Sequence, residues 1–167
     1  QVEKGRGYLA RAGELDPQFA LAWAYLANRE AWKYLADHRT PEQPNKARVA
    51  MEMANKLRPE ASESHAAAGS FYYYCLRDYD RALAEFRKAR ELSPSSANAI
   101  VMTAMVKRRQ GQLPESIQLQ LEAASLYPRN DDVWVNPGRS YRAEQRFADA
   151  REMFHCATAL LPADPSI

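Results

Sequence analysis

Residues 134–162 read WVNPGRSYRAEQRFADAREMFHCATALLP, a stretch that ends on the tripeptide Leu160-Leu161-Pro162. The same Leu-x-Pro pattern occurs five times in the chain, and the gaps in numbering between its prolines are 42, 35, 34 and 34. These prolines are Pro17, Pro59, Pro94, Pro128 and Pro162. A nearly constant period of this length indicates a series of repeated structural units.

Residues of fixed size accompany each proline. An alanine stands five residues before every proline, a small residue stands twelve before it, and a large apolar residue stands eight before it, except at Gln120. The alanines are Ala12, Ala54, Ala89, Ala123 and Ala157, the small residues are Gly5, Ala47, Ala82, Ser116 and Ala150, and the large ones are Leu9, Met51, Phe86 and Phe154. Small side chains let two helices approach closely, and a proline just past a helix stops it. Each unit is therefore predicted to be a helix–turn–helix.

Helix is favoured throughout, because the chain has only 6 glycines and few β-branched residues. Apolar spacing pairs the predicted helices within each unit, with Pro44 and Pro114 at the starts of second helices, where a missing N–H costs least. The pairs are 17–37 with 44–57, 60–76 with 79–92, 95–110 with 114–126, and 130–144 with 147–160. Residues 1–15 match a second helix alone.

The chain resembles the tetratricopeptide repeat (TPR) family, whose pattern is W-x2-L-G-x2-Y, then A-x3-F, then A and P. The last unit carries this pattern as Trp134, Gly138, Tyr141, Ala150, Phe154, Ala157 and Pro162. The resemblance covers essentially the whole chain and implies an all-α fold, an α-α superhelix (solenoid) of about four helical hairpins plus an N-terminal half repeat. The expected segments are 1–17 (half repeat), 18–59, 60–94, 95–128, 129–162 and a tail at 163–167.

Two features depart from the repeat pattern. The first interval is longer than the last two by eight, which predicts an insertion near 36–43 that lengthens the first helix and its turn. Pro137 stands inside a predicted first helix, where it removes one backbone hydrogen bond at a cost of about 3 kcal/mol. We expect either a kink near 133–137 or a helix that starts late. Solenoid ends normally carry polar caps, and we expect the repeat ends here to be uncapped. Uncapped ends would expose apolar surface, through which we expect self-association.

Charge and motifs exclude several functions. The formal net charge of +2 gives no reason to expect a nucleic-acid or membrane-surface partner, and the basic run 107–109 is expected to be solvated. No phosphate-binding loop, nucleophile elbow or metal-ligand spacing is present, and the three histidines lie far apart in the sequence. The two cysteines form no disulfide framework, which favours the cytoplasm. We predict a protein that is not an enzyme and needs no cofactor.

The resemblance implies that a ligand lies in the concave groove formed by the first helices of the repeats. Side chains there that are not committed to the helix-pair core form a gradient, apolar and aromatic toward the N-terminal half and rich in arginine toward the C-terminal half. The predicted peptide-binding residues are Tyr25, Asn28, Phe71, Tyr74, Met102, Met105, Arg108, Asn136, Arg139 and Arg142. Arginine forks suit carboxylates, and aromatics with methionines suit apolar anchors, so we expect a peptide with an apolar end and an acidic end. The competing interpretation is that the tyrosines are core and the arginines are solvated.

One subfamily is disfavoured. TPR domains that grip the C-terminal carboxylate of heat-shock proteins use Lys, Asn and Arg side chains of three successive first helices, and here only Asn28 matches that pattern. The leading prediction is a protein- or peptide-binding scaffold that mediates protein–protein interactions. The alternative is a regulatory TPR arm of a larger bacterial signalling protein, such as a nucleotide cyclase or transcription regulator, that contacts its own neighbouring domain.

Overall fold

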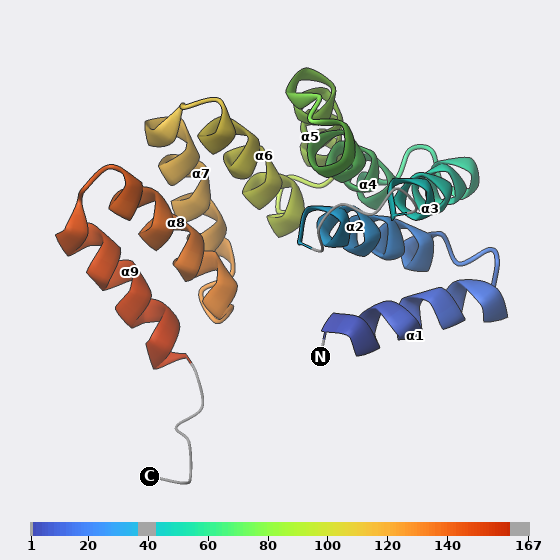
Figure 1. Cartoon of the computed structure of the whole chain (residues 1–167), viewed down its shortest axis with the longest axis horizontal. Coiled ribbons are helices and arrows are strands. Elements are labelled where there is room, and N and C mark those ends of the chain that lie inside the picture. Colours follow the sequence, from blue (N-terminus) through green and yellow to red (C-terminus); the bar gives the residue numbers. More distant parts are fainter. Residues whose placement is uncertain (1, 37–42, 161–167) are drawn as a thin grey trace, which may run out of the picture. The chain divides into compact units, whose positions relative to one another are not determined.

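The computed structural model describes residues 2–36 and 43–160, and these residues are helical apart from short connections (Figure 1). The helices match the predicted ones closely, so the all-α fold class is confirmed. Their bounds are α1 Val2–Leu15, α2 Ala20–Ala36, α3 Gln43–Leu57, α4 Ser62–Phe71, the π-helical segment η1 Tyr72–Leu76, α5 Tyr79–Leu92, α6 Ala97–Arg109, α7 Leu113–Leu126, α8 Asp131–Ala143 and α9 Phe147–Ala159. Most of the predicted insertion near 36–43, and the tail at 163–167, lie outside the described residues.

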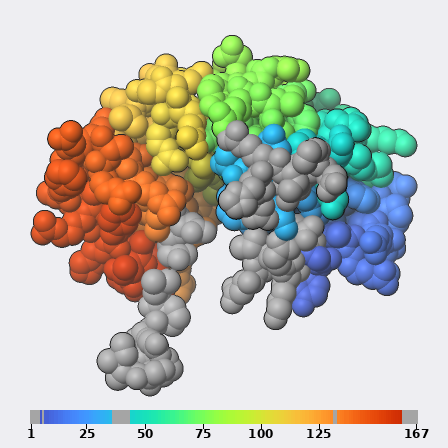
Figure 2. All heavy atoms as spheres, viewed as in Figure 1, coloured from blue at the N-terminus to red at the C-terminus, as the bar shows by residue number. Residues whose placement is uncertain are grey.

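The chain divides into two compact units, residues 1–99 and 100–167. In the first unit α2 pairs with α3 and α4 pairs with α5, while α2 also packs on α1 and α4. In the second unit α8 packs on both α7 and α9, and Figure 2 shows α8 and α9, in orange and red, in contact along the visible face. Each unit is thus built from helical hairpins; the predicted single solenoid over 1–167 stays a prediction.

Small residues allow the close approach of paired helices, as the sequence pattern predicts. Ala47, Ala54, Ala82 and Ala89 are fully buried. A Cβ added at Gly69 would lie 2.5 Å from the ring of Phe86, and one added at Gly138 would lie 2.7 Å from the ring of Phe154. Both aromatic rings stand eight residues before their proline, so the same glycine–phenylalanine contact recurs in two repeats.

Replacing Gly69 with alanine is expected to lower the free energy of unfolding by about 1–2 kcal/mol, because overpacking outweighs the gain in helix propensity. The ring of Phe86 is fully buried and has little room to move. The matched control is Gly7→Ala in α1, where an added Cβ meets nothing within 4 Å, and which is expected to stabilise by about 0.5–1 kcal/mol. Urea denaturation followed by circular dichroism measures both, and equal effects of the two substitutions would contradict the packing argument.

The turns that follow η1, α6 and α8 share one backbone conformation. Arg77, Gly111 and Gln145 have positive φ angles of 55°, 79° and 59°, and each stands at the same distance before the proline that ends its repeat. The next residue donates a backbone hydrogen bond back to the first helix: Gln112 to Lys107 and Arg146 to Tyr141, both over five residues, but Asp78 to Tyr72 over six. The left-handed residue reverses the chain, and the hydrogen bond satisfies a helix-end carbonyl.

The six-residue span at Asp78 explains why the interval from Pro59 to Pro94 is one residue longer than the two intervals after it. The first helix of every repeat begins three residues after a proline, at Ala20, Ser62, Ala97 and Asp131. The span from that start to the left-handed residue is equal in the last two repeats but one residue longer in the repeat 60–94. The additional residue is accommodated in η1 as a π-turn, in which hydrogen bonds span five residues. The sequence interval showed that a residue was added but not where.

A tryptophan fixes the start of two first helices. The indole Nε1 of Trp23 donates to the carbonyl of Pro17 at 3.2 Å, and that of Trp134 donates to the carbonyl of Pro128 at 3.0 Å. In both cases the tryptophan follows the proline by six residues. In these two repeats the tryptophan therefore links the first helix to the turn before it.

Gln120, the exception in the large apolar position, is buried between α6 and α7. Its Nε2 donates to Ser116 Oγ at 3.0 Å, and Ser116 Oγ donates to the Ala104 carbonyl at 2.7 Å. Its Oε1 is buried and has no hydrogen-bond partner within the described ranges. A buried acceptor without a partner costs about 1–3 kcal/mol.

Replacing Gln120 with methionine is expected to raise the free energy of unfolding by about 1 kcal/mol. The substitution keeps the volume and removes the unpaired acceptor, while Ser116 retains its bond to Ala104. Thermal and urea denaturation provide the measurement. Gln118→Met, at an exposed position of the same helix, serves as the control and should change stability by less than about 0.5 kcal/mol. A loss of stability in Gln120→Met would contradict this prediction and indicate that Gln120 Oε1 accepts a hydrogen bond in solution.

Pro137 lies inside α8, which begins at Asp131. The expectation of a late helix start is therefore wrong. The proline removes only one intrahelical hydrogen bond, and its ring is buried within the unit, so packing holds the helix together across it. The expected kink near 133–137 stays a prediction.

Candidate peptide-binding surface

An apolar stripe runs along α2. Leu21, Tyr25 and Trp32 are 40%, 49% and 42% exposed. Their spacing of four and seven residues places them on one side of the helix. We call these three residues the α2 apolar stripe.

The rest of α2 explains why this side is exposed. Its alanines are buried, and the helix packs on α1, α3 and α4, where small side chains permit a close approach. The buried alanines are Ala20, Ala22, Ala24, Ala27 and Ala31. Because the alanines occupy the packed sides of α2, Leu21, Tyr25 and Trp32 lie on the remaining side, which no described element covers fully.

Asn28 lies within the stripe, between Tyr25 and Trp32. Its Nδ2 donates to the carbonyl of Ala24 at 3.1 Å, and its Oδ1 is buried without a hydrogen-bond partner in the described part of the chain. Asn28 is half-buried, so the polar group is held against the helix and interrupts the apolar surface. Beside it Arg29 is exposed, which gives this side of α2 a positive edge.

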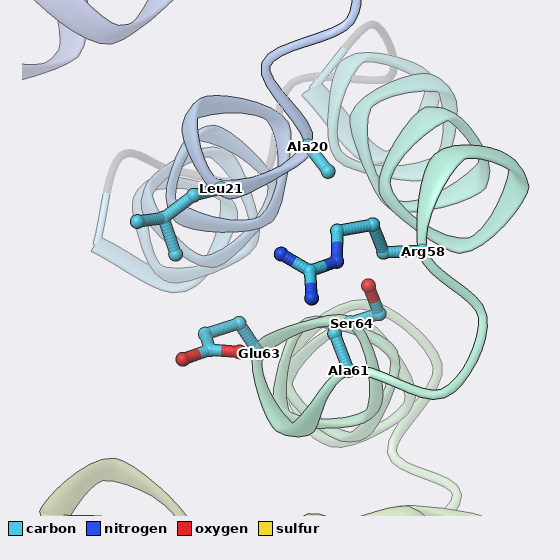
Figure 3. Close-up of a pocket in the computed structure, with 6 residues that line it drawn as sticks. All are labelled: Ala20, Leu21, Arg58, Ala61, Glu63 and Ser64. Atoms are coloured by element: carbon cyan, nitrogen blue, oxygen red, sulfur yellow. The ribbon is translucent and has the colours of Figure 1, made fainter.

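A small pocket adjoins the start of the stripe. Its volume is about 110 Å³, and it lies where the beginnings of α2 and α4 meet the end of α3 (Figure 3). Its lining residues are Ala20, Leu21, Arg58, Ala61, Glu63 and Ser64. Leu21 belongs to both the stripe and the pocket, so the two features form one continuous surface of the first unit.

The ten residues predicted for the groove have very different environments. In the first unit Tyr25 is exposed and Asn28 is half-buried, but Phe71 and Tyr74 are each only 7% exposed. The ring of Tyr74 packs edge-on against that of Tyr73, with centroids 4.7 Å apart. Most of the Phe71 and Tyr74 surface already contacts the chain itself, so a ligand would gain little apolar area from either ring.

The other six predicted residues belong to the second unit. Met102 is buried, Met105, Arg108 and Asn136 are half-buried, and Arg139 and Arg142 are exposed. A single groove lined by all ten residues stays a prediction. Sequence reasoning did not select Leu21, Trp32 or Arg58. The spacing of Leu21 and Trp32 from Tyr25 was visible in the sequence, whereas Arg58, the middle residue of a Leu-x-Pro tripeptide, carried no signal.

The thiol of Cys75 is partly buried in the first unit. Burial raises the pKa of the Cys75 thiol to about 12, so the nucleophilic thiolate is scarce near neutral pH. Within residues 2–36 and 43–160, no group of three or more His, Cys, Asp or Glu side chains could hold a metal ion. None of the described helices is both long and apolar enough to cross a membrane.

Comparison with solved structures identifies the fold. YrrB, described as a TPR protein with an unusual peptide-binding site, is 22% identical, with a TM-score of 0.60 over 96% of this chain and 78% of its own. The pilF protein of Pseudomonas aeruginosa is 17% identical, with a TM-score of 0.64 over 98% and 76%. MamA of Desulfovibrio magneticus RS-1 is 18% identical, with a TM-score of 0.62 over 95% and 85%.

The class of fold is thereby settled: the chain has the tetratricopeptide-repeat fold that its sequence pattern predicts. No family model matches the chain, and no curated protein matches it. Identities of this size establish the shared fold and leave the ligand to be argued from this chain's own residues.

Proposed function

We propose that this chain is a protein-binding scaffold that takes a peptide segment of its partner on the α2 apolar stripe. The observation that carries the proposal is the exposure of Leu21, Tyr25 and Trp32 on one side of a helix whose remaining sides are packed. Tyrosine and tryptophan are enriched among residues that dominate binding energy. Large apolar side chains that gather on one exposed side of a helix, here with Asn28 between two of them, favour an interaction site.

The partner segment is expected to combine apolar anchors with acidic residues. Each square ångström of apolar surface that the segment covers contributes about 25 cal/mol before the costs of ordering are subtracted. Arg29 is exposed beside the stripe on the same helix. Arginine binds carboxylates through two parallel hydrogen bonds, which favours acidic residues in the partner. YrrB, which shares the fold, is described as having a peptide-binding site, and this likeness is consistent with a peptide ligand here.

Site-specific photocrosslinking tests the proposal. A benzophenone amino acid placed at Tyr25 is expected to crosslink one partner segment, which mass spectrometry identifies and whose synthetic peptide competes for the crosslink. Val49 on α3 is 48% exposed and provides the control position. Crosslinks that form from Val49 and not from Tyr25 would refute the use of the stripe and favour the alternative, a regulatory arm that contacts a neighbouring domain.

A further inference from the structure

We propose that the pocket beside Leu21 receives a carboxylate of the bound peptide and that Arg58 holds it. This inference rests on the proposed function, because it concerns the end of the same surface. It adds a polar contact that fixes the direction and register of the peptide, which the apolar stripe alone cannot specify.

The position of Arg58 supports an anionic ligand. Its backbone N–H donates to the Ala54 carbonyl at 2.9 Å, which fixes the residue just beyond the end of α3. Figure 3 shows its side chain reaching into the middle of the pocket. No ion pair joins Arg58 to any residue in the described ranges, so the fork of N–H donors remains available to a ligand.

The other lining residues leave room for one small group. Ala20, Leu21 and Ala61 form apolar walls, and Ser64 is buried with its hydroxyl engaged on the Ala54 carbonyl at 3.2 Å. About 110 Å³ is well below the roughly 300–1,000 Å³ of pockets that hold drug-sized ligands. The pocket is therefore suited to the end of one side chain or of the peptide itself.

The charges around the pocket favour a carboxylate over a cation, although one acid is present. Glu63 lines the pocket, but its carboxylate points away from the Arg58 guanidinium (Figure 3). The one acidic residue of α2, Glu30, is buried, whereas Arg29 is exposed on the same helix. The site also differs from that of the TPR domains that grip the C-terminal carboxylate of heat-shock proteins. Those domains use side chains of first helices, whereas Arg58 follows a second helix.

Two sources can supply the carboxylate, the C-terminus of a peptide or the side chain of Asp or Glu. A library of random dodecapeptides with free C-termini is selected against the whole chain. The strongest binder is then synthesised with a C-terminal carboxylate, with a C-terminal amide, and with its acidic residues changed to Asn or Gln. Isothermal titration calorimetry measures the affinity of each peptide for the wild type and the variants.

Arg58→Ala is expected to weaken binding at least about tenfold, as loss of a charge-assisted pair does. The matched control is Arg48→Ala on α3, where Arg48 pairs with Glu52 at 2.8 Å, and it should leave affinity unchanged. Glu63→Gln should strengthen binding a few-fold, a result that a purely structural role for the pocket does not produce. The difference between Arg58→Ala and wild type should disappear with the amide peptide if the C-terminus is bound, or with the Asn/Gln peptide if a side chain is bound.

Two results overturn the proposal in distinguishable ways. If Arg58→Ala binds like the wild type while Tyr25→Ala weakens binding, the stripe binds peptides and the pocket does not. If neither variant changes the affinity, or if no peptide is selected, both the pocket and the proposed function are refuted. Circular dichroism confirms that each variant is folded before its affinity is interpreted.

Discussion

Replacing Phe86 with alanine is expected to lower the free energy of unfolding by about 3–5 kcal/mol, the range for removing a fully buried phenylalanine ring. The ring is fully buried and lies against the backbone of Gly69, so the surrounding helices can close the cavity only by moving their backbones. Removing the ring therefore costs both the transfer of apolar surface and a residual cavity. Urea denaturation followed by circular dichroism and tryptophan fluorescence measures the change.

Two other phenylalanines act as controls for this prediction. Phe147 is 61% exposed, and its replacement by alanine should change stability by less than about 0.5 kcal/mol. Phe154 occupies the equivalent repeat position and packs against Gly138, but it is only partly buried, so Phe154→Ala should fall between the two. A loss below about 1 kcal/mol in Phe86→Ala would mean that the hairpin of α4 and α5 collapses around the missing ring.

Replacing both Tyr25 and Trp32 with alanine is expected to weaken peptide binding at least about 100-fold. Central aromatic residues of interfaces often contribute about 2 kcal/mol or more each, and about 1.4 kcal/mol corresponds to a factor of ten. Both side chains are more than two-fifths exposed, so the free chain should lose little stability. Isothermal titration calorimetry with the peptide identified by crosslinking gives the affinity, and circular dichroism gives the stability.

Tyr8 on α1 provides the matched control for the double variant. It is more exposed than Tyr25 but lies on another helix, so Tyr8→Ala should bind the peptide as the wild type does. An equal loss in Tyr8→Ala would place the peptide elsewhere or indicate non-specific apolar binding. An affinity unchanged in the double variant would exclude the α2 apolar stripe as the binding surface.

The helices were predictable because local rules determine them. A proline follows each second helix, and a small residue stands at each close approach. Both signals recur at fixed distances, so a helix boundary that is ambiguous in one repeat can be assigned from the others. Pro137 shows the limit of such rules. The local penalty predicted a kink or a late start, and α8 begins at Asp131, so the late start does not occur, because packing within the unit outweighs the loss of one hydrogen bond.

The candidate site was less predictable, because exposure depends on contacts between helices. The sequence identified Tyr25 as a groove residue, and its exposure is consistent with that role. Phe71 and Tyr74 carried the same signal, yet both are buried, since neighbouring rings and helices cover them. Arg58 illustrates the reverse case. The residue type at the middle of the Leu-x-Pro tripeptide differs from repeat to repeat in this chain, so the sequence offers no reason to select Arg58. The pocket that it enters forms only in the folded chain, where the beginnings of α2 and α4 lie beside the end of α3.

The π-turn of η1 shows how this fold accommodates the insertion or deletion of a single residue. The repeat 60–94 has one residue more than the two repeats after it. Its first helix still begins at the same distance after a proline, and its left-handed turn and second helix still lie at the same distances before the next proline, as in those two repeats. The added residue is confined to one helical turn, so it does not shift the packing of the next hairpin. Deleting a single residue from 72–76 should therefore return this repeat to the length of the two repeats after it without altering the helices that follow.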